Sequence, residues 1–374
     1  MTVSCVYDFN ADLPLGADLP FVIEGDIILG EMSPFNISVV NSVAAGVKKD
    51  YKASFFVEDE TGKIYPSTTD GFSDRATIDM STALQDVKYR LRIDIKHEDK
   101  SISHYASSWL SPEPEVSVSY RDSSIYRIVP GTAGTKELVS KRYYLDISSP
   151  GSSGCYCWEY ELLIKIPATL SEPTYDFDPI SGILVHRGYG WWGKSVCWSV
   201  SQPAISTVFS AKAMINQELK DHYGFSIQGY DYLRASKIKL KVRAIPEGAF
   251  RFLSTINKNS DNTGSVFSPV PGEAMGNIYN IDNPSELAVG YVSVYKQKET
   301  LILDADIPNN FHPVDGYVKN PLEGMTEGES ELQRFQMFYE KGYRPYDSPT
   351  RWVPERCINC EMLMRGSSVY PDGW

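Results

Sequence analysis

Apolar and polar residues alternate along many short runs of this chain. Residues 90–96 alternate charged with aliphatic side chains, and residues 237–245 place Lys or Arg between aliphatic side chains in the same way. Because successive side chains of a β-strand point to opposite faces, a period of two predicts strands with one buried and one solvated face. Further strand-like runs cover residues 21–28, 35–40, 52–57, 142–147 and 157–166. The pattern predicts an all-β protein.

The length of 374 residues exceeds one ordinary core and predicts two domains. Closely spaced strands over the first hundred residues suggest an immunoglobulin-like β-sandwich, which we place at residues 19–114. Its last residues, 107–114, are rich in Ser and Pro and suit a connector. We expect a larger β-rich, sandwich-like domain over residues 115–374. One or two short helices are predicted in it, because apolar residues recur at helical spacing near residues 248–257 and 329–339.

Composition excludes several classes of protein. Hydrophobic residues make up 42% of the chain and aromatic residues 12%, which is enough apolar surface for substantial cores and excludes wholesale disorder. The formal net charge is −12 and no strongly basic block occurs, so nucleic-acid binding is not expected. No run approaches the roughly 18 apolar residues of a membrane-spanning helix.

Residues 188–195 match both the phosphate-binding loop and the dinucleotide-binding fingerprint. Either site needs a helix directly after the loop, whose N-terminal amides hold phosphate. Residues 196–203 instead look extended and end in Pro203, and alternating βα units are absent. We therefore interpret the match as chance, and no cofactor is predicted.

The same loop carries three large aromatic residues between glycines. In one interpretation their flat faces are exposed and stack on a ligand. In the other, which is the commoner arrangement for large aromatic side chains, the tryptophans pack on the core of the second domain. The candidate ligand-binding residues are Tyr189, Trp191 and Trp192.

Catalytic signatures are weak. No two of the five histidines have H-x-x-x-H spacing, and no G-x-S-x-G motif occurs. The pairs Asp176/Asp178 and Asp304/Asp306 would suit calcium or a glycosidase-like acid and base, but such pairs arise freely among 48 acidic residues. We predict no enzyme activity and no metal site.

The six cysteines have several interpretations. Cys5 follows a small residue and precedes an acidic stretch with Pro and Gly, which suits a lipid-anchored Cys followed by a tether over residues 6–18; the alternative is an ordinary thiol. The other five suit structural disulfides of an oxidising compartment better than a thioredoxin-like motif or a four-thiolate zinc site. Their pairing stays open. The disulfide candidates are Cys155, Cys157, Cys197, Cys357 and Cys360.

Three parts of the chain resemble one protein family. They are the two ends and a segment near residue 280. The matching segments are Ser4-Cys5, Asp12-Leu13-Pro14, Phe21-Val22-Ile23-Glu24-Gly25, Gly276-Asn277-Ile278, Gly290-Tyr291-Val292, Cys357-Ile358-Asn359-Cys360, Arg365-Gly366-Ser367-Ser368 and Pro371-Asp372-Gly373-Trp374. They resemble a family of Bacteroidota-type outer-membrane lipoproteins that is catalogued only as a domain of unknown function. Its members are typically encoded beside TonB-dependent receptors of the SusC type.

The resemblance implies a function as well as a location. It assigns residues 1–18 to the lipid anchor, Cys5, and its tether, and it places the protein on the outer membrane, facing the cell exterior and bound through the lipid alone. The implied role is non-catalytic: capture or uptake of a nutrient, such as a small oligomeric glycan or peptide, with a SusC-like TonB-dependent transporter. The alternatives are a surface hydrolase acting on glycans or peptides and a purely structural adhesin module.

Overall fold

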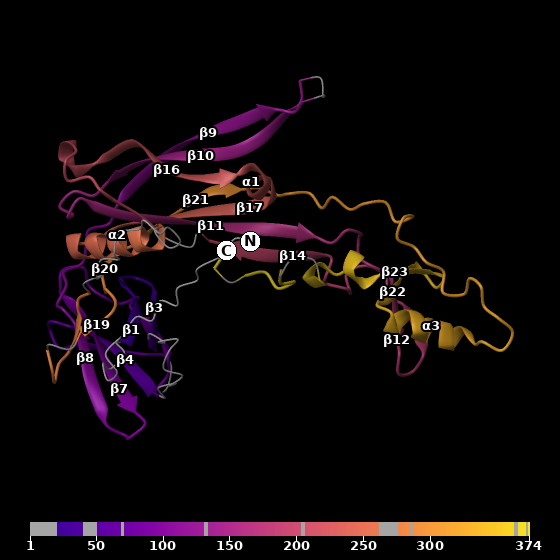
Figure 1. Cartoon of the computed structure of the whole chain (residues 1–374), viewed down its shortest axis with the longest axis horizontal. Helices are drawn as coiled ribbons and strands as arrows, with labels where there is room; N and C mark the ends of the chain where they lie inside the picture. The colour runs from indigo at the N-terminus through magenta and orange to yellow at the C-terminus, as the bar shows by residue number, and fades with distance from the viewer. Residues whose placement is uncertain are drawn as a thin grey trace, which may run out of the picture.

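The computed structural model shows a protein built mainly from β-strands, which confirms the predicted all-β fold (Figure 1). Cys5 and its predicted tether lie outside the described residues. No helix in the described part of the chain is long and apolar enough to cross a membrane. The described residues are 21–39, 51–68, 71–130, 134–202, 206–261, 276–284, 287–362, 366–371 and 373–374.

Two sheets form the N-terminal sandwich. The first has the order β1-β3-β6 and the second the order β19-β18-β8-β7-β4-β5. The alternation predicted over residues 90–96 is present in β7, where Leu91, Ile93 and Ile95 are buried and the residues between them are partly exposed. The strands are β1 (Phe21–Gly25), β3 (Met32–Val39), β4 (Tyr51–Asp59), β5 (Ile64–Pro66), β6 (Arg75–Asp79), β7 (Tyr89–His97), β8 (Ile102–Ser107), β18 (Ile278–Asn280) and β19 (Leu287–Ala288).

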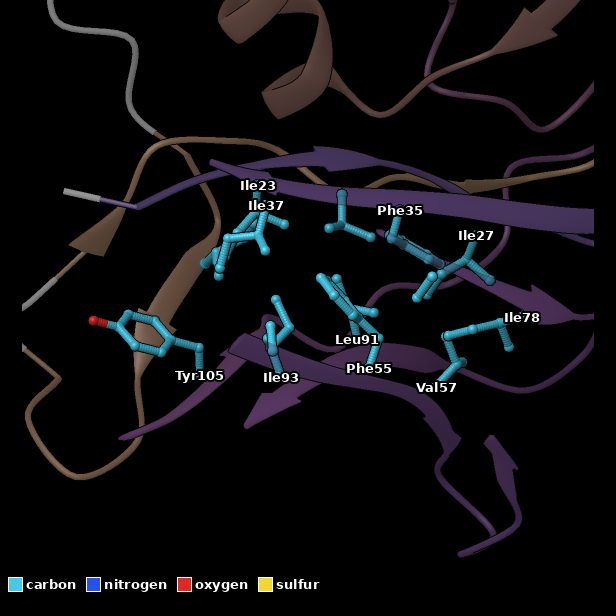
Figure 2. Close-up of a cluster of buried hydrophobic side chains, with 14 of the residues drawn as sticks. Ile23, Ile27, Phe35, Ile37, Phe55, Val57, Ile78, Leu91, Ile93 and Tyr105 are labelled. Carbon is cyan, nitrogen blue, oxygen red and sulfur yellow. The ribbon is translucent and has the colours of Figure 1, made fainter. Parts of the chain in front are cut away.

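The core of the sandwich lies between these sheets. Figure 2 shows Ile23 and Ile37 of the first sheet facing Leu91 and Ile93 of the second. Phe35 and Phe55 stack across the two sheets with ring centroids 6.2 Å apart. Because the apolar side chains of both sheets alternate inward, they interdigitate into one core.

Residues far along the chain complete this sandwich. β18 pairs with β8, and the short strand β20 (Val294–Tyr295) pairs in parallel with β2 (Ile27–Ile28). Between these pairings, the Ile23 amide donates to the Val289 carbonyl over 2.8 Å. Strand pairing therefore extends the sandwich to residues beyond the predicted range 19–114.

A second sandwich encloses the largest remaining core. Its five-stranded sheet has the order β14-β11-β17-β21, with β15 also paired to β11, and its three-stranded sheet has the order β16-β10-β9. Trp158 is buried between them and its indole N–H donates to the Gly224 carbonyl over 3.0 Å. The strands are β9 (Ser117–Ile128), β10 (Lys136–Ser148), β11 (Cys155–Pro167), β14 (Val196–Ser201), β15 (Thr207–Ser210), β16 (Leu219–Gln228), β17 (Ala235–Ala244) and β21 (Lys298–Asp304).

A smaller lobe lies at the opposite end of the large sheet from the N-terminal sandwich (Figure 1). Its core contains Phe177, Phe335 and Trp352. Its elements are β12 (Tyr175–Asp178), β13 (Ile183–His186), α3 (Glu331–Glu340), β22 (Tyr343–Ser348), β23 (Arg351–Pro354), η2 (Glu355–Cys357) and η3 (Cys360–Met362).

The helices agree with two of the predictions. α3 begins after Ser330, whose side chain and that of Gln333 form a reciprocal capping box, and α2 (Glu247–Asp261) covers the other predicted range. α1 (Gly229–Arg234) was not predicted, because six residues between two strands are too short to show a helical period.

Candidate functional site

The aromatic loop 187–195 connects β13 to β14. A strand rather than a helix follows the loop, so the nucleotide-binding pattern lacks the helix N-terminus that it requires. Gly188, Gly190 and Gly193 have φ angles of 75°, 89° and 65°, in the left-handed region that favours glycine. The glycines therefore serve the turns of this loop.

The three aromatic residues of the loop differ in exposure. Trp192 packs against the buried cluster around Leu170 and Ile358, and its indole N–H donates to the Ile358 carbonyl over 2.6 Å. Trp191 is partly buried and donates to the Pro173 carbonyl over 2.7 Å. Tyr189 is 79% exposed. The structure thus leaves Tyr189 as the accessible aromatic side chain of the loop.

Residues 172–174 hold the loop in place. The Arg187 amide donates to the Thr174 carbonyl over 2.8 Å, and the Gly190 amide donates to a carboxylate oxygen of Glu172 over 2.7 Å. At the far end of the loop, the Ala168 amide donates to the Ser195 carbonyl over 2.7 Å. The chain that leaves β11 therefore supports the whole loop.

Residues 166–169 of this segment also line a surface hollow of about 330 Å³. Residues from three separate segments meet there: the end of β11, helix α1 and the irregular chain after β21. The His312 amide donates to the Thr169 carbonyl over 2.8 Å, which fixes the third segment against the first. The lining includes Pro167, Thr169, Tyr230, Arg234, Asn310 and His312.

The hollow combines an aromatic ring with polar and cationic groups. Tyr230 is 65% exposed, and Arg234, one helical turn later, places its guanidinium 4.9 Å from the ring centroid. An Arg234 nitrogen also donates to the Tyr230 hydroxyl over 2.8 Å. Such a ring can stack on an apolar face of a ligand while guanidinium, imidazole and amide groups bind its oxygen atoms.

Three of the four carboxylates in the acidic pairs, Asp176, Asp178 and Asp306, make local contacts. Asp176 accepts from Arg187 over 3.1 Å, and Asp306 forms an ion pair with Lys165 at 3.5 Å. Asp178 accepts from the Ile180 amide and the Ser181 hydroxyl, and these hydrogen bonds, chiefly that of Ser181, lower its pKa. Across the described residues, no three His, Cys, Asp or Glu side chains are grouped so that they could hold a metal.

One disulfide joins two of the predicted cysteines. Cys197 of β14 is bonded to Cys360 of η3, with Cα atoms 5.6 Å apart and a sequence separation of 163. The bond fixes the chain after β23 to the large sheet.

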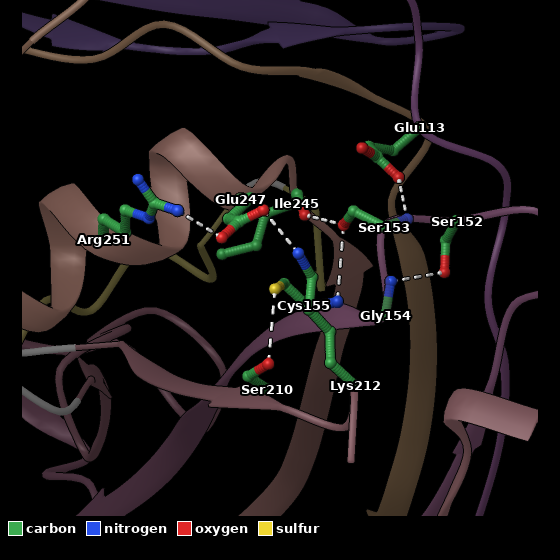
Figure 3. Close-up of polar contacts among 10 residues, drawn as sticks. All are labelled: Glu113, Ser152, Ser153, Gly154, Cys155, Ser210, Lys212, Ile245, Glu247 and Arg251. Carbon is green, nitrogen blue, oxygen red and sulfur yellow. Dashed lines mark hydrogen bonds and ion pairs between the residues drawn. The ribbon is translucent and has the colours of Figure 1, made fainter. Parts of the chain in front are cut away.

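The disulfide prediction is wrong for the other three candidate cysteines. Cys155, Cys157 and Cys357 are free, buried thiols. Cys155 and Cys157 point to one face of β11, where they pack with Ile245, and the Cys155 thiol donates to the Ser210 hydroxyl over 3.7 Å (Figure 3). Burial raises the pKa of Cys157 to about 11, so this thiol stays protonated and unreactive at neutral pH.

Sequence reasoning did not identify the residues of the hollow. Tyr230 and Arg234 are four residues apart, a spacing that places them on one face of a helix, and this was the available signal. Asn310 and His312 lie in irregular chain and reach the hollow through the fold alone.

A family model described as a domain of unknown function, DUF4249, matches residues 10–300, which is more than three quarters of the chain. A search of curated proteins finds no match.

Proposed function

Because this chain belongs to the DUF4249 family of domains of unknown function, we propose that it is a non-catalytic surface lipoprotein that serves a TonB-dependent transporter in nutrient capture or uptake. In this proposal the protein is of Bacteroidota type and faces the exterior of the outer membrane. Cys5 carries the lipid, and the transporter is SusC-like. The resemblance of both chain ends and of residues 276–294 to such lipoproteins supports these finer assignments.

The hollow beside α1 carries the binding part of the proposal. It places the exposed Tyr230 ring, the Arg234 guanidinium and the His312 side chain around one open space. Sugars and peptides both have apolar faces bordered by oxygen atoms, so either chemistry suits a stacking ring beside hydrogen-bond donors. The proposed ligand is a short glycan or peptide.

The contacts made by the candidate catalytic carboxylates support a ligand-binding role rather than a hydrolytic one. A hydrolytic acid and base must reach a substrate, and both members of the pair Asp176/Asp178 are engaged in an ion pair and a turn instead. A purely structural adhesin would not need the open, polar-aromatic hollow.

Membrane extraction tests the anchor and the transporter together. The tagged protein, expressed with its native leader, is extracted in mild detergent, and co-purifying proteins and the mass of its N-terminal peptide are measured. We expect a lipid on Cys5 and a stoichiometric TonB-dependent barrel. We expect Cys5→Ala to abolish lipidation and recovery of the protein in the membrane fraction, whereas the neighbouring Val6→Ala should affect neither. Recovery of the lipidated protein alone under several gentle conditions would contradict the transporter assignment.

Panels of oligosaccharides and oligopeptides test the hollow. For a panel member that binds, we expect Tyr230→Ala to weaken affinity about threefold to tenfold, because the stacking contact is lost. The control is Tyr223→Ala, which changes an exposed tyrosine outside the hollow, on β16, and should leave affinity unchanged. Loss of binding in Tyr189→Ala with none in Tyr230→Ala would move the site to the aromatic loop. Release of cleaved products by the wild-type protein would overturn the non-catalytic assignment.

A further inference from the structure

Strand β9 has an open edge. It spans 12 residues, pairs with β10 on one side, and has no strand on its other side in the described parts of the chain. In Figure 1 it is the uppermost strand of the molecule. An open edge presents a row of unpaired backbone N–H and C=O groups that can bind another strand.

β9 lacks two of the devices that usually protect an edge, namely Pro or Gly and a bulge on the strand itself. The strand contains neither Pro nor Gly, and the register shift of the hairpin falls on β10, between Leu138 and Ser140. β16, at the opposite edge of the same sheet, is interrupted by two register shifts and by Asp221 with φ of 50°. β9 is therefore the continuous edge of this sheet.

Apolar side chains are exposed along the same strand. Tyr120, Tyr126 and Ile128 are 38%, 56% and 70% exposed. Exposed apolar side chains beside an open backbone edge are the combination that strand pairing between molecules buries.

Each charged side chain of β9 already has an ion-pair partner within one molecule. Arg121 is paired with Asp221, Asp122 with Lys141 at 2.6 Å, and Arg127 with Glu137 at 2.8 Å. An approaching strand therefore need not supply opposite charges, but it must not place like charges directly opposite these side chains.

We propose that β9 pairs antiparallel with β9 of a second copy, about a two-fold axis that passes through Ser123. In this register Tyr120 faces Tyr126 and Val118 faces Ile128, each twice by symmetry. Cross-strand aromatic and aliphatic pairs of this kind stabilise a sheet. The two three-stranded sheets then become one continuous sheet.

Neighbouring two-fold registers are less favourable. An axis through Ser124 places Arg121 opposite Arg127, and an axis through Asp122 places that carboxylate opposite its own copy. Like charges directly opposite are destabilising. The side chains of β9 thus select the axis at Ser123. This inference is independent of the proposed function.

Charge substitution at the axis tests the pairing. All samples carry Cys5→Ala, so that this thiol cannot cross-link copies, and mass is measured by sedimentation equilibrium. We expect a dimer that dissociates on dilution. Ser123→Lys and Ser123→Asp each place like charges across the axis and raise the dimer dissociation constant about tenfold or more. A mixture of the two variants restores the dimer, because opposite charges then face each other.

Two further variants separate pairing from folding. Tyr126→Ala removes a side chain that is mostly exposed in the single molecule, and it weakens the dimer without lowering the thermal stability measured at dilutions where the wild type is monomeric. Ser226→Lys on β16 is the matched control and leaves the dimer unchanged. A wild-type protein that stays monomeric at about 100 μM, a dimer insensitive to Ser123 and Tyr126, or a Lys and Asp mixture that stays monomeric would each overturn the proposal.

Discussion

Asp26 and Arg243 place charge at the junction between the N-terminal sandwich and the large sheet. The Asp26 carboxylate accepts from the Ser293 amide over 2.7 Å and from the Tyr295 hydroxyl over 3.2 Å. Arg243 is 8% exposed, lies 5.0 Å from the Tyr295 ring centroid and forms an ion pair with Glu159 at 3.4 Å. Because Ser293 and Tyr295 are both buried, the carboxylate satisfies donors that water cannot reach.

Removing that carboxylate is expected to destabilise the protein. Asp26→Ala leaves two buried donors without acceptors, which should lower the free energy of unfolding by about 2–3 kcal/mol, as measured by urea denaturation. Asp99→Ala is the control, because Asp99 accepts hydrogen bonds in an exposed turn, and it should cost less than about 1 kcal/mol. Equal losses in the two variants would contradict a role for Asp26 at the junction.

His222 is expected to make stability depend on pH. Its ring lies 4.2 Å from the Phe209 centroid and 5.9 Å from that of Trp158, and burial lowers its pKa below the ordinary 6.5. The unfolded chain therefore binds the proton more tightly than the folded chain. Above pH 6.5 the neutral His222 makes its whole contribution to the free energy of unfolding. That contribution is lost as the pH falls through the lowered pKa of the folded state.

The urea midpoint at pH 7.5 and at pH 5.5 measures this contribution. His222→Phe keeps an aromatic ring but cannot be protonated, so the midpoint of this variant should fall less between the two pH values than that of the wild type. His186→Phe, at an exposed position on β13, should follow the wild type. A His222→Phe variant with the full wild-type decline would assign the pH dependence to other groups.

At the scale of elements, the disulfide fixes η3 to β14. Cys197→Ala combined with Cys360→Ala removes a link across 163 residues, and we expect the free energy of unfolding to fall by about 2–5 kcal/mol. Thermal unfolding with and without a reductant measures the effect. The reductant should lower the midpoint of the wild type and leave that of the double variant unchanged. A reductant-sensitive double variant would show that the loss has another origin.

Periodicity predicted the elements that have one buried face. β7 alternates because its two faces meet core and solvent, and α2 and α3 pack one apolar side, so a pattern was visible in each. β9 was not predicted, because an edge strand with exposed residues on both faces has no period. Partners brought together from distant segments leave no local signal, which is why the disulfide pairing and the hollow around His312 could not be derived from the sequence.

At the scale of the whole molecule, the N-terminal sandwich depends on residues near the other end of the matched family region. Ile278, Val292 and Val294 are almost fully buried in its core. Each contributes about 2 kcal/mol of apolar burial, so their combined loss is comparable to the entire stability of a domain.

A fragment of residues 19–114 is therefore expected to lack a cooperative thermal transition by circular dichroism. Joining residues 276–296 to it through a Gly/Ser linker should restore the transition, because β18 and β20 then reach their partners β8 and β2. A linker-joined sequence of the same length and composition in scrambled order is the control. A cooperative transition in the short fragment would mean that residues up to 114 form a self-sufficient domain.

The late position of β18 and β20 in the sequence also sets when the N-terminal sandwich can fold during synthesis. At about 5–20 residues per second, the roughly 170 residues between Leu110 and Ile278 take about 10–30 s to synthesise. Throughout that interval residues 21–110 lack the strands that complete their sandwich, so their apolar side chains stay exposed. The first domain to leave the ribosome is consequently among the last to fold.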